Sequence, residues 1–217
     1  ASGFAALSKA LAEFSRMNLG ERKLSQLARR GSGSAARSIT GGLSAFPTGS
    51  DPAARLLIDA REIDWSMVVV TVEESPKKIS SREGMEHTRQ TSPYFERWTE
   101  QAAEDYKAML EAINDRDFTG IGELMESNAL AMHGCIMSSR PPIIYWNPAT
   151  LQIIDKVKKW RDDGLETYFT IDAGSNVVLL CEKEDTDKVV AKAKEIKEAD
   201  NIIKSGPGGG AEVLAKS

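Results

Sequence analysis

The run of residues 65–72 limits the possible folds of this chain more than any other segment does. It is rich in β-branched residues, which is typical of a strand buried inside a sheet. Helical and strand-like patterns follow it, so we expect a region of α+β class that begins near Arg61. Helices are predicted at 80–113, 118–132, 148–160 and 185–199, and further strands at 167–172, 176–182 and 210–214.

The residues before this strand form a separate region with a helical pattern. Its apolar positions recur at helical spacing and are Phe4, Leu7, Leu11 and Phe14. Ser2 is expected to cap this first helix, which should end near residues 18–20, and Ser25 should cap a short second helix. We therefore divide the chain into residues 1–60 and residues 61–217.

Composition excludes several classes of protein. A net charge of −4 and a pI near 5.4 argue against the concentrated basic face of a nucleic-acid-binding protein. No apolar run is long enough to span a membrane, and the first residues do not form a signal peptide. Cys135 and Cys181 make neither a disulfide framework nor a metal site, so we expect a cytoplasmic, reduced protein.

The densest cluster of chemically useful residues covers positions 29–38. It combines the small residues of a Gly/Ser loop with three hydroxyls and the guanidinium of Arg37. Exposed amides, hydroxyls and a planar fork of N–H groups suit a phosphate or a carboxylate. From composition alone, a flexible Ser/Gly linker with surface arginines explains the cluster equally well.

Two further clusters have simpler explanations when each is considered by itself. Residues 77–85 place Ser80 and Ser81 at a predicted helix start, where amides and the helix dipole would attract an anion. An ordinary N-capped helix explains them more simply. In residues 170–176, Asp172 ends an apolar strand before a turn, and a hairpin whose Asp caps backbone amides is again the simpler explanation.

The remaining candidates are interpreted as structural. His133 has no second His or Cys at ligand spacing and is predicted to lie at a helix end. The segment 206–210 lacks the Lys-Ser/Thr pair of a phosphate loop, so we interpret it as a turn. No metal site built from side chains is predicted.

Taken in order, these clusters resemble the diphosphomevalonate decarboxylase family, a member of the superfamily of galactokinase, homoserine kinase and mevalonate kinase. Five ordered segments carry the resemblance: 1–7, 27–38, 80–85, 128–145 and 172–176. The second segment is the most specific, although the family commonly has Cys where Ala36 stands. In the fifth segment, the family usually has Pro where Ser175 stands. The resemblance implies the C-terminal portion of the two-domain kinase fold. Residues 1–60 would be the remnant of a ribosomal-protein-S5-like, ATP- and substrate-binding domain, and residues 61–217 a ferredoxin-like α+β domain.

The resemblance also implies residue roles in an ATP-dependent decarboxylase of the mevalonate pathway that makes isopentenyl diphosphate. Asp172 would lie beside the 3-hydroxyl of (R)-5-diphosphomevalonate, as a general base or as a stabiliser of charge at C3. Arg37 would hold the substrate carboxylate bidentately. Ser2 and Gly3 would lie next to the ATP phosphates and Mg²⁺. Further substrate contacts would come from Ser32, Gly33, Ser34, Ala35, Ala36, Ser81 and Arg82.

The family's N-terminal half-domain, with most of its ATP loop, is not found among these 217 residues. We therefore expect a truncated chain that is inactive alone, unless an N-terminal fragment stays associated with it. The other expected partners are a phosphorylated mevalonate and a second copy in a homodimer, with neither nucleic acid nor membrane. Three alternatives stay open: a phosphomevalonate decarboxylase, a mevalonate 3-kinase, and a non-catalytic binding or dimerisation fragment. The presence of both Arg37 and Asp172 favours decarboxylation over simple kinase action.

Overall fold

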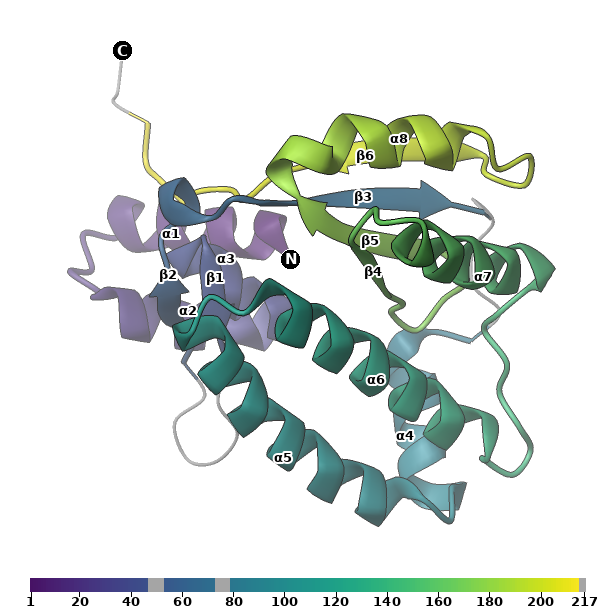
Figure 1. Cartoon of the computed structure of the whole chain (residues 1–217). Helices are drawn as coiled ribbons and strands as arrows, with labels where there is room; N and C mark the ends of the chain where they lie inside the picture. The colour runs from purple at the N-terminus through teal and green to yellow at the C-terminus, as the bar shows by residue number, and fades with distance from the viewer. Residues whose placement is uncertain (47–52, 73–78, 215–217) are drawn as a thin grey trace. The chain divides into compact units, whose positions relative to one another are not determined.

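The computed structural model describes residues 1–46, 53–72 and 79–214 (Figure 1). The chain divides into two compact units, Ala1–Asp64 together with the tail from Gly206, and Trp65–Ser205. The sequence-based division placed the tail in the second region. The structure differs because the tail leaves the sheet after Ser205 and bonds to the first unit, where the Ala211 amide donates to the Ser38 carbonyl at 3.0 Å.

The first unit is a small helical unit with a two-stranded sheet. Its helices are α1 (Ser2–Phe14), α2 (Glu21–Gly31) and α3 (Arg37–Thr40), and its antiparallel strands are β1 (Leu43–Ala45) and β2 (Arg55–Ile58). Mostly small side chains form its core: Ala5, Ala12, Leu24, Ala28, Ala35 and Ile39. Small residues on facing helices let the backbones approach closely, so α1 and α2 pack tightly.

The predicted apolar face of α1 does not face this core. Phe4, Leu7 and Leu11 are about half exposed, and Phe14 is 88% exposed. The buried face of α1 carries Ala5, Ser8 and Ala12 instead. The helix also ends at Phe14 rather than near residues 18–20, and Ser2 is its first residue rather than its cap.

Ser25 is not a helix cap either. The second helix begins at Glu21, after Gly20, and encloses Ser25 on its buried face. The Ser25 hydroxyl donates to the Ala36 carbonyl at 3.0 Å and accepts from the Ala54 amide at 2.8 Å. A buried hydroxyl needs such partners, so Ser25 ties α2 to two distant segments of its unit.

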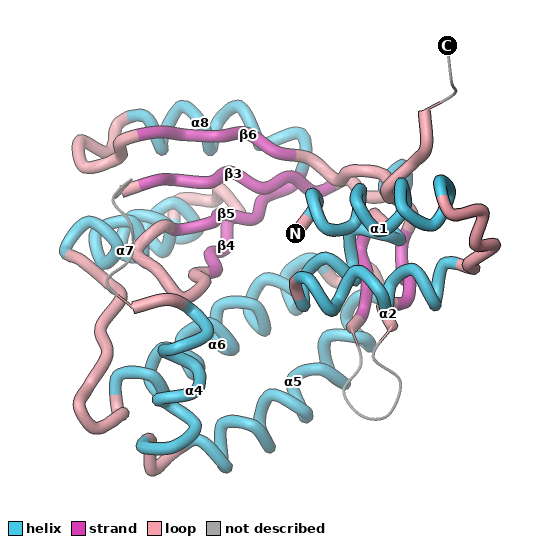
Figure 2. Tube along the Cα trace, turned by 180° about the vertical axis from the view of Figure 1, so that it is seen from behind, coloured by secondary structure: helices cyan, strands magenta, loops and turns pink. Residues whose placement is uncertain are grey.

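The second unit is built on a four-stranded antiparallel sheet in the order β4-β5-β3-β6. Its strands are β3 (Trp65–Thr71), β4 (Thr167–Thr170), β5 (Val177–Glu182) and β6 (Asn201–Ser205). The predicted buried strand is β3, which pairs on both sides. The helices α7 (Pro148–Asp162) and α8 (Thr186–Lys194) pack on one face of the sheet (Figures 1 and 2). The core there contains Val68, Val70, Val157, Phe169, Leu179 and Val189.

Three more helices complete the second unit: α4 (Ser81–Thr91), α5 (Phe95–Asn114) and α6 (Phe118–Met137). The last of these contacts β4, where the Phe118 ring lies 5.8 Å from the Tyr168 ring. Gly122 is required at this contact, because a β-carbon there would lie 2.1 Å from the Tyr168 ring. None of the helices in the described ranges is long and apolar enough to cross a membrane.

Three sequence predictions about the second unit are corrected. The helix predicted at 80–113 is two helices, because Pro93 removes a backbone donor between α4 and α5. The helix predicted to end near His133 continues to Met137. The last strand is β6, not 210–214, because the Pro/Gly segment from Gly206 stops the sheet. Residues 77–78 of the second cluster lie outside the described residues.

Candidate active site

The Gly/Ser segment of the first unit forms an ordered turn between two helices. Ser32 caps the C-terminus of α2, residues Gly33–Ala36 form a 3₁₀ turn, and Arg37 begins α3. The Ser32 and Ser34 hydroxyls are 3.1 Å apart. Ala35 and Ala36 are fully buried, so neither residue exposes an atom to a ligand in this structure. The flexible-linker explanation does not fit a segment with this hydrogen bonding and burial.

A cavity of about 540 Å³ lies beside this turn, wholly within the first unit. Three of the predicted site residues meet there: Ser2, Ser34 and Arg37. The predicted residues Gly3, Ser32, Gly33, Ala35 and Ala36 do not line it. The Arg37 guanidinium is exposed and forms no ion pair with any of the described residues. Its charge is therefore available to an anion.

The glycine-rich tail forms one wall of this cavity, through Gly208–Ala211. The Gly42 amide donates to the Gly208 carbonyl at 2.9 Å, beside an antiparallel bridge between Gly41 and Gly209. Gly41 has φ of 69°, and a β-carbon there would lie 2.2 Å from the Gly210 nitrogen. Only glycine fits so close a crossing. The sequence interpretation as a turn missed this role, for which the run of glycines was the available signal.

The predicted Ser81 and Arg82 lie in the first turn of α4, in the second unit. The cap of α4 is Ser80, whose hydroxyl accepts from the Glu83 amide at 3.2 Å while Glu83 Oε2 accepts from the Ser80 amide at 3.0 Å. These bonds from Ser80 hold the pKa of the Glu83 carboxyl below its usual value. Because Ser80 supplies the cap, Ser81 and Arg82 remain exposed at an anchored helix N-terminus.

Asp172 follows β4 and has an exposed side chain. His133 Nε2 is 3.2 Å from the Ile171 carbonyl and 3.1 Å from the Asp172 carbonyl. The prediction of His133 at a helix end is wrong, because His133 lies inside α6 with 1% of its surface exposed. Burial lowers the pKa of the His133 imidazole below its ordinary value of 6.5.

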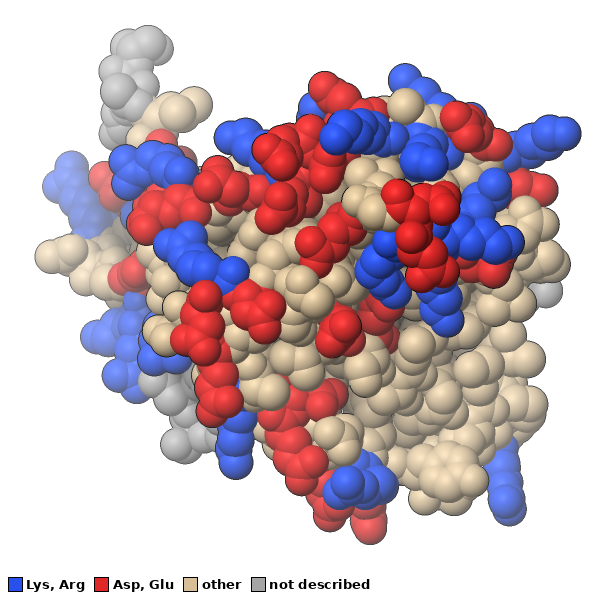
Figure 3. Space-filling view, viewed as in Figure 1, with Lys and Arg blue, Asp and Glu red and all other residues tan. Residues whose placement is uncertain are grey.

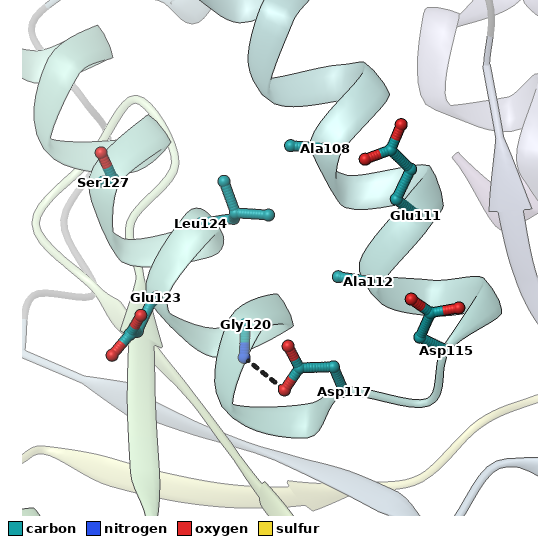
Figure 4. A pocket seen from close by; sticks show the side chains of 9 residues that line it. All are labelled: Ala108, Glu111, Ala112, Asp115, Asp117, Gly120, Glu123, Leu124 and Ser127. Carbon is teal, nitrogen blue, oxygen red and sulfur yellow. Dashed lines mark hydrogen bonds between the residues drawn. The ribbon is translucent and has the colours of Figure 1, made fainter.

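A second hollow, of about 460 Å³, lies between α5 and α6 (Figure 4). Four of its lining residues are acidic: Glu111, Asp115, Asp117 and Glu123. Acidic side chains also gather along α5 on the face shown in Figure 3. Phosphates would be repelled there, so this hollow is not the phosphate-binding site. Asp117 has a structural role, since its Oδ1 accepts from the Gly120 amide at 2.9 Å.

Comparison with known proteins relates both units to one family. A family model of the mevalonate 5-diphosphate decarboxylase C-terminal domain matches residues 67–208. A model of the diphosphomevalonate decarboxylase-like N-terminal domain matches residues 1–56. The chain is 33% identical to the diphosphomevalonate decarboxylase of Candida albicans over 201 residues, which is 88% of this chain and 55% of that protein. The chain thus spans about half the length of this relative.

Two other matches bear on the ligands. The chain is 29% identical to the phosphomevalonate decarboxylase of Haloferax volcanii over 219 residues, covering all of this chain and 66% of that protein. A solved structure described as MDDEF in complex with MVAPP, AMPPCP and magnesium has 36% identity and a TM-score of 0.88. That match covers 99% of this chain and 67% of the solved one.

Proposed function

The chain belongs to the mevalonate 5-diphosphate decarboxylase family, and from this premise we propose that it forms part of an ATP-dependent decarboxylase. The proposed reaction converts (R)-5-diphosphomevalonate and ATP into isopentenyl diphosphate, ADP, phosphate and CO₂. The observation that carries the proposal is the cavity of the first unit, which Ser2, Ser34 and Arg37 line together. A guanidinium that pairs with no carboxylate of the described residues, in a cavity that serine residues also line, suits a small ligand that carries a carboxylate and phosphates.

Arg37 is the proposed carboxylate-binding residue. Its planar fork donates two parallel N–H bonds to one carboxylate, which fixes the plane of that group. When the phosphate leaves C3, the bond from C2 to the carboxylate breaks, and its electron pair forms the C2–C3 double bond as CO₂ departs. This elimination requires the breaking bond to be aligned with the departing phosphate, so orientation of the carboxylate contributes directly to the rate.

Asp172 is the proposed residue beside the 3-hydroxyl. Its carboxylate would accept the hydroxyl proton as the γ-phosphoryl group of ATP is transferred to the 3-oxygen. Alternatively, a carboxylate that stays ionised would stabilise the positive charge that develops at C3 as the phosphate departs. An exposed carboxylate just beyond the end of a strand is available for either task.

Ser2 and Gly3 are the proposed ATP contacts. They begin α1, a helix of 13 residues whose first amides lack partners within the helix and are suited to phosphate oxygens. Within the described ranges no group of three or more His, Cys, Asp or Glu side chains is arranged to hold a metal ion. Mg²⁺ bound to the nucleotide phosphates would neutralise their charge, with Ser2 nearby.

Phosphomevalonate decarboxylation is the second candidate function, because the Haloferax relative with that name aligns with the whole chain. Supplying ATP with each phosphorylated mevalonate to the intact protein and measuring CO₂ release distinguishes the two. ADP release without CO₂ would instead indicate a 3-kinase. In the same assay, Asp172→Asn should lower kcat at least about a hundredfold with little change in KM. Turnover within a few-fold of wild type would leave Asp172 as a turn residue only.

Three expectations about the protein's surroundings stay predictions. An N-terminal segment associated with the first unit is supported by the exposed apolar side chains of α1. A cytoplasmic location is consistent with the two buried cysteines, which are both free thiols. The homodimer is expected from the family resemblance alone, and sedimentation of the intact protein would test it.

A further inference from the structure

His133 places a hydrogen-bond donor against the backbone that carries Asp172. Both neighbours of its Nε2 atom are carbonyl oxygens, which accept hydrogen bonds and cannot donate them. The hydrogen of the neutral ring must therefore be on Nε2, and the ring donates to both oxygens. The Trp146 ring lies 4.8 Å from the His133 ring and the Tyr145 ring lies edge-on at 6.4 Å, so aromatic packing restricts its rotation.

The two carbonyls lie where the sheet can no longer bond them. Pairing between β4 and β5 ends at Thr170 and Val178, so Ile171 and Asp172 lie just beyond the ladder. Buried carbonyls that leave a ladder need another donor, and an imidazole within a 20-residue helix supplies it from a rigid position.

Two other side chains hold the remainder of this loop. The Thr150 hydroxyl, at the start of α7, donates to the Ser175 carbonyl at 2.7 Å. Asn176 Oδ1 accepts from the Val72 amide at 2.9 Å, which ties the loop to the end of β3. Residues 171–176 are therefore fixed from α6, α7 and β3. With the described residues the Asp172 carboxylate itself makes no hydrogen bond or ion pair, so the backbone sets its position.

We propose that His133 is a positioning residue for the reaction: its Nε2–H fixes the backbone at Ile171 and Asp172 and so sets the direction of the Asp172 carboxylate. The proposal rests on the proposed role of Asp172 in decarboxylation. His133 itself is too deeply buried to touch a substrate. Its effect should therefore fall on turnover rather than on substrate binding.

The test compares two substitutions in the intact protein. Gln can present its side-chain amide nitrogen near the position of the imidazole Nε2 and keep the donor, whereas Met fills similar space without one. His133→Met should lower kcat for CO₂ release by about tenfold to a hundredfold, because a small misplacement of a catalytic group has an effect of that size. KM should change less than about twofold, and His133→Gln should recover most of the lost kcat.

The chain supplies its own control in His87, its only other histidine. His87 Nε2 also lies against a backbone carbonyl, that of Pro141 at 2.8 Å, but at an exposed site. His87→Met should leave kcat within about twofold of wild type. In the intact protein, the ¹⁵N-imidazole NMR signals that are lost in His133→Met are those of the His133 ring. His133 should give the signature of a neutral ring protonated at Nε2.

Amide hydrogen exchange supplies a readout that does not depend on activity. In His133→Met, amides in residues 171–176 should exchange at least about tenfold faster, while those within β5 keep their rates.

Unchanged kcat in His133→Met, equal losses in the Met and Gln variants, or a ring protonated at Nδ1 would each overturn the proposal. If the wild-type protein releases no CO₂, the proposed function fails; loop exchange that is unchanged in His133→Met would then overturn the positioning role as well. If His133→Met does not fold, the kcat of the Gln variant and the wild-type NMR spectrum still test whether His133 positions this loop.

Discussion

Arg37 begins α3 directly after the ordered Gly/Ser turn, with its guanidinium exposed beside the cavity of the first unit. Arg37→Lys keeps the charge but loses the planar fork, so the carboxylate should be misaligned rather than released. We expect CO₂ release by the intact protein to fall about tenfold or more, since a lost charge-assisted bond is worth about 1.5–3 kcal/mol. Arg37→Leu should lower it further. Near-normal decarboxylation by the Leu variant would show that this cavity does not bind the carboxylate.

At the residue scale, the sequence could predict groups whose neighbours along the chain reveal them. Arg37 and Ser34 belong to one short Gly/Ser segment, and the structure places both at the same cavity. His133 and Ser25 were misassigned, because a histidine or a serine within a helical pattern says nothing about partners elsewhere. The partner carbonyls of His133 are 38 and 39 residues away, and the Ala54 amide is 29 residues from Ser25. Only the tertiary fold brings such groups together.

At the element scale, α1 carries a stripe of large apolar side chains that lies outside its packed face. Large apolar side chains at helical spacing usually mark a buried face, so we expect a further segment of the intact protein to cover Leu7 and Leu11. Replacing both with Glu should then destabilise the intact protein, by about 1.5–3 kcal/mol for each buried side chain. Urea unfolding measures this. Glu13→Lys, on an exposed polar position of α1, is the matched control and should change stability by less than about 0.5 kcal/mol. Equal stability of the double variant and wild type would show that Leu7 and Leu11 are exposed to solvent in the intact protein.

The elements themselves were predictable in proportion to the strength of their apolar pattern. The run that became β3 is a nearly continuous apolar segment, and it lies inside the sheet with both sides paired. By contrast, β6 is an edge strand of mostly exposed residues, so its sequence carries little alternation to detect. The position of the tail was harder still to predict from the sequence, because it depends on backbone contacts between glycines, which leave no hydrophobic pattern.

At the scale of the whole molecule, the two units differ in how much core each contains. Among the described residues, the core that joins the sheet to α7 and α8 in the second unit contains fifteen buried residues, whereas the corresponding cluster of the first unit contains six, four of them alanines. Burial of apolar area is the main stabilising contribution to folding, so the second unit should not need the first in order to fold.

We therefore expect a polypeptide of residues 65–205 to fold by itself and to unfold in one cooperative urea transition followed by circular dichroism. A polypeptide of residues 1–64 should show no such transition, because its core is small and α1 exposes its largest apolar side chains. Extending the second polypeptide to residue 214 is the matched control for the tail. Because the tail bonds to the first unit at Ser38 and Gly42, the extension should shift the urea midpoint very little. A clearly higher midpoint for 65–214 would assign the tail to the second unit, and a gradual, non-cooperative loss of structure in 65–205 would contradict its independence.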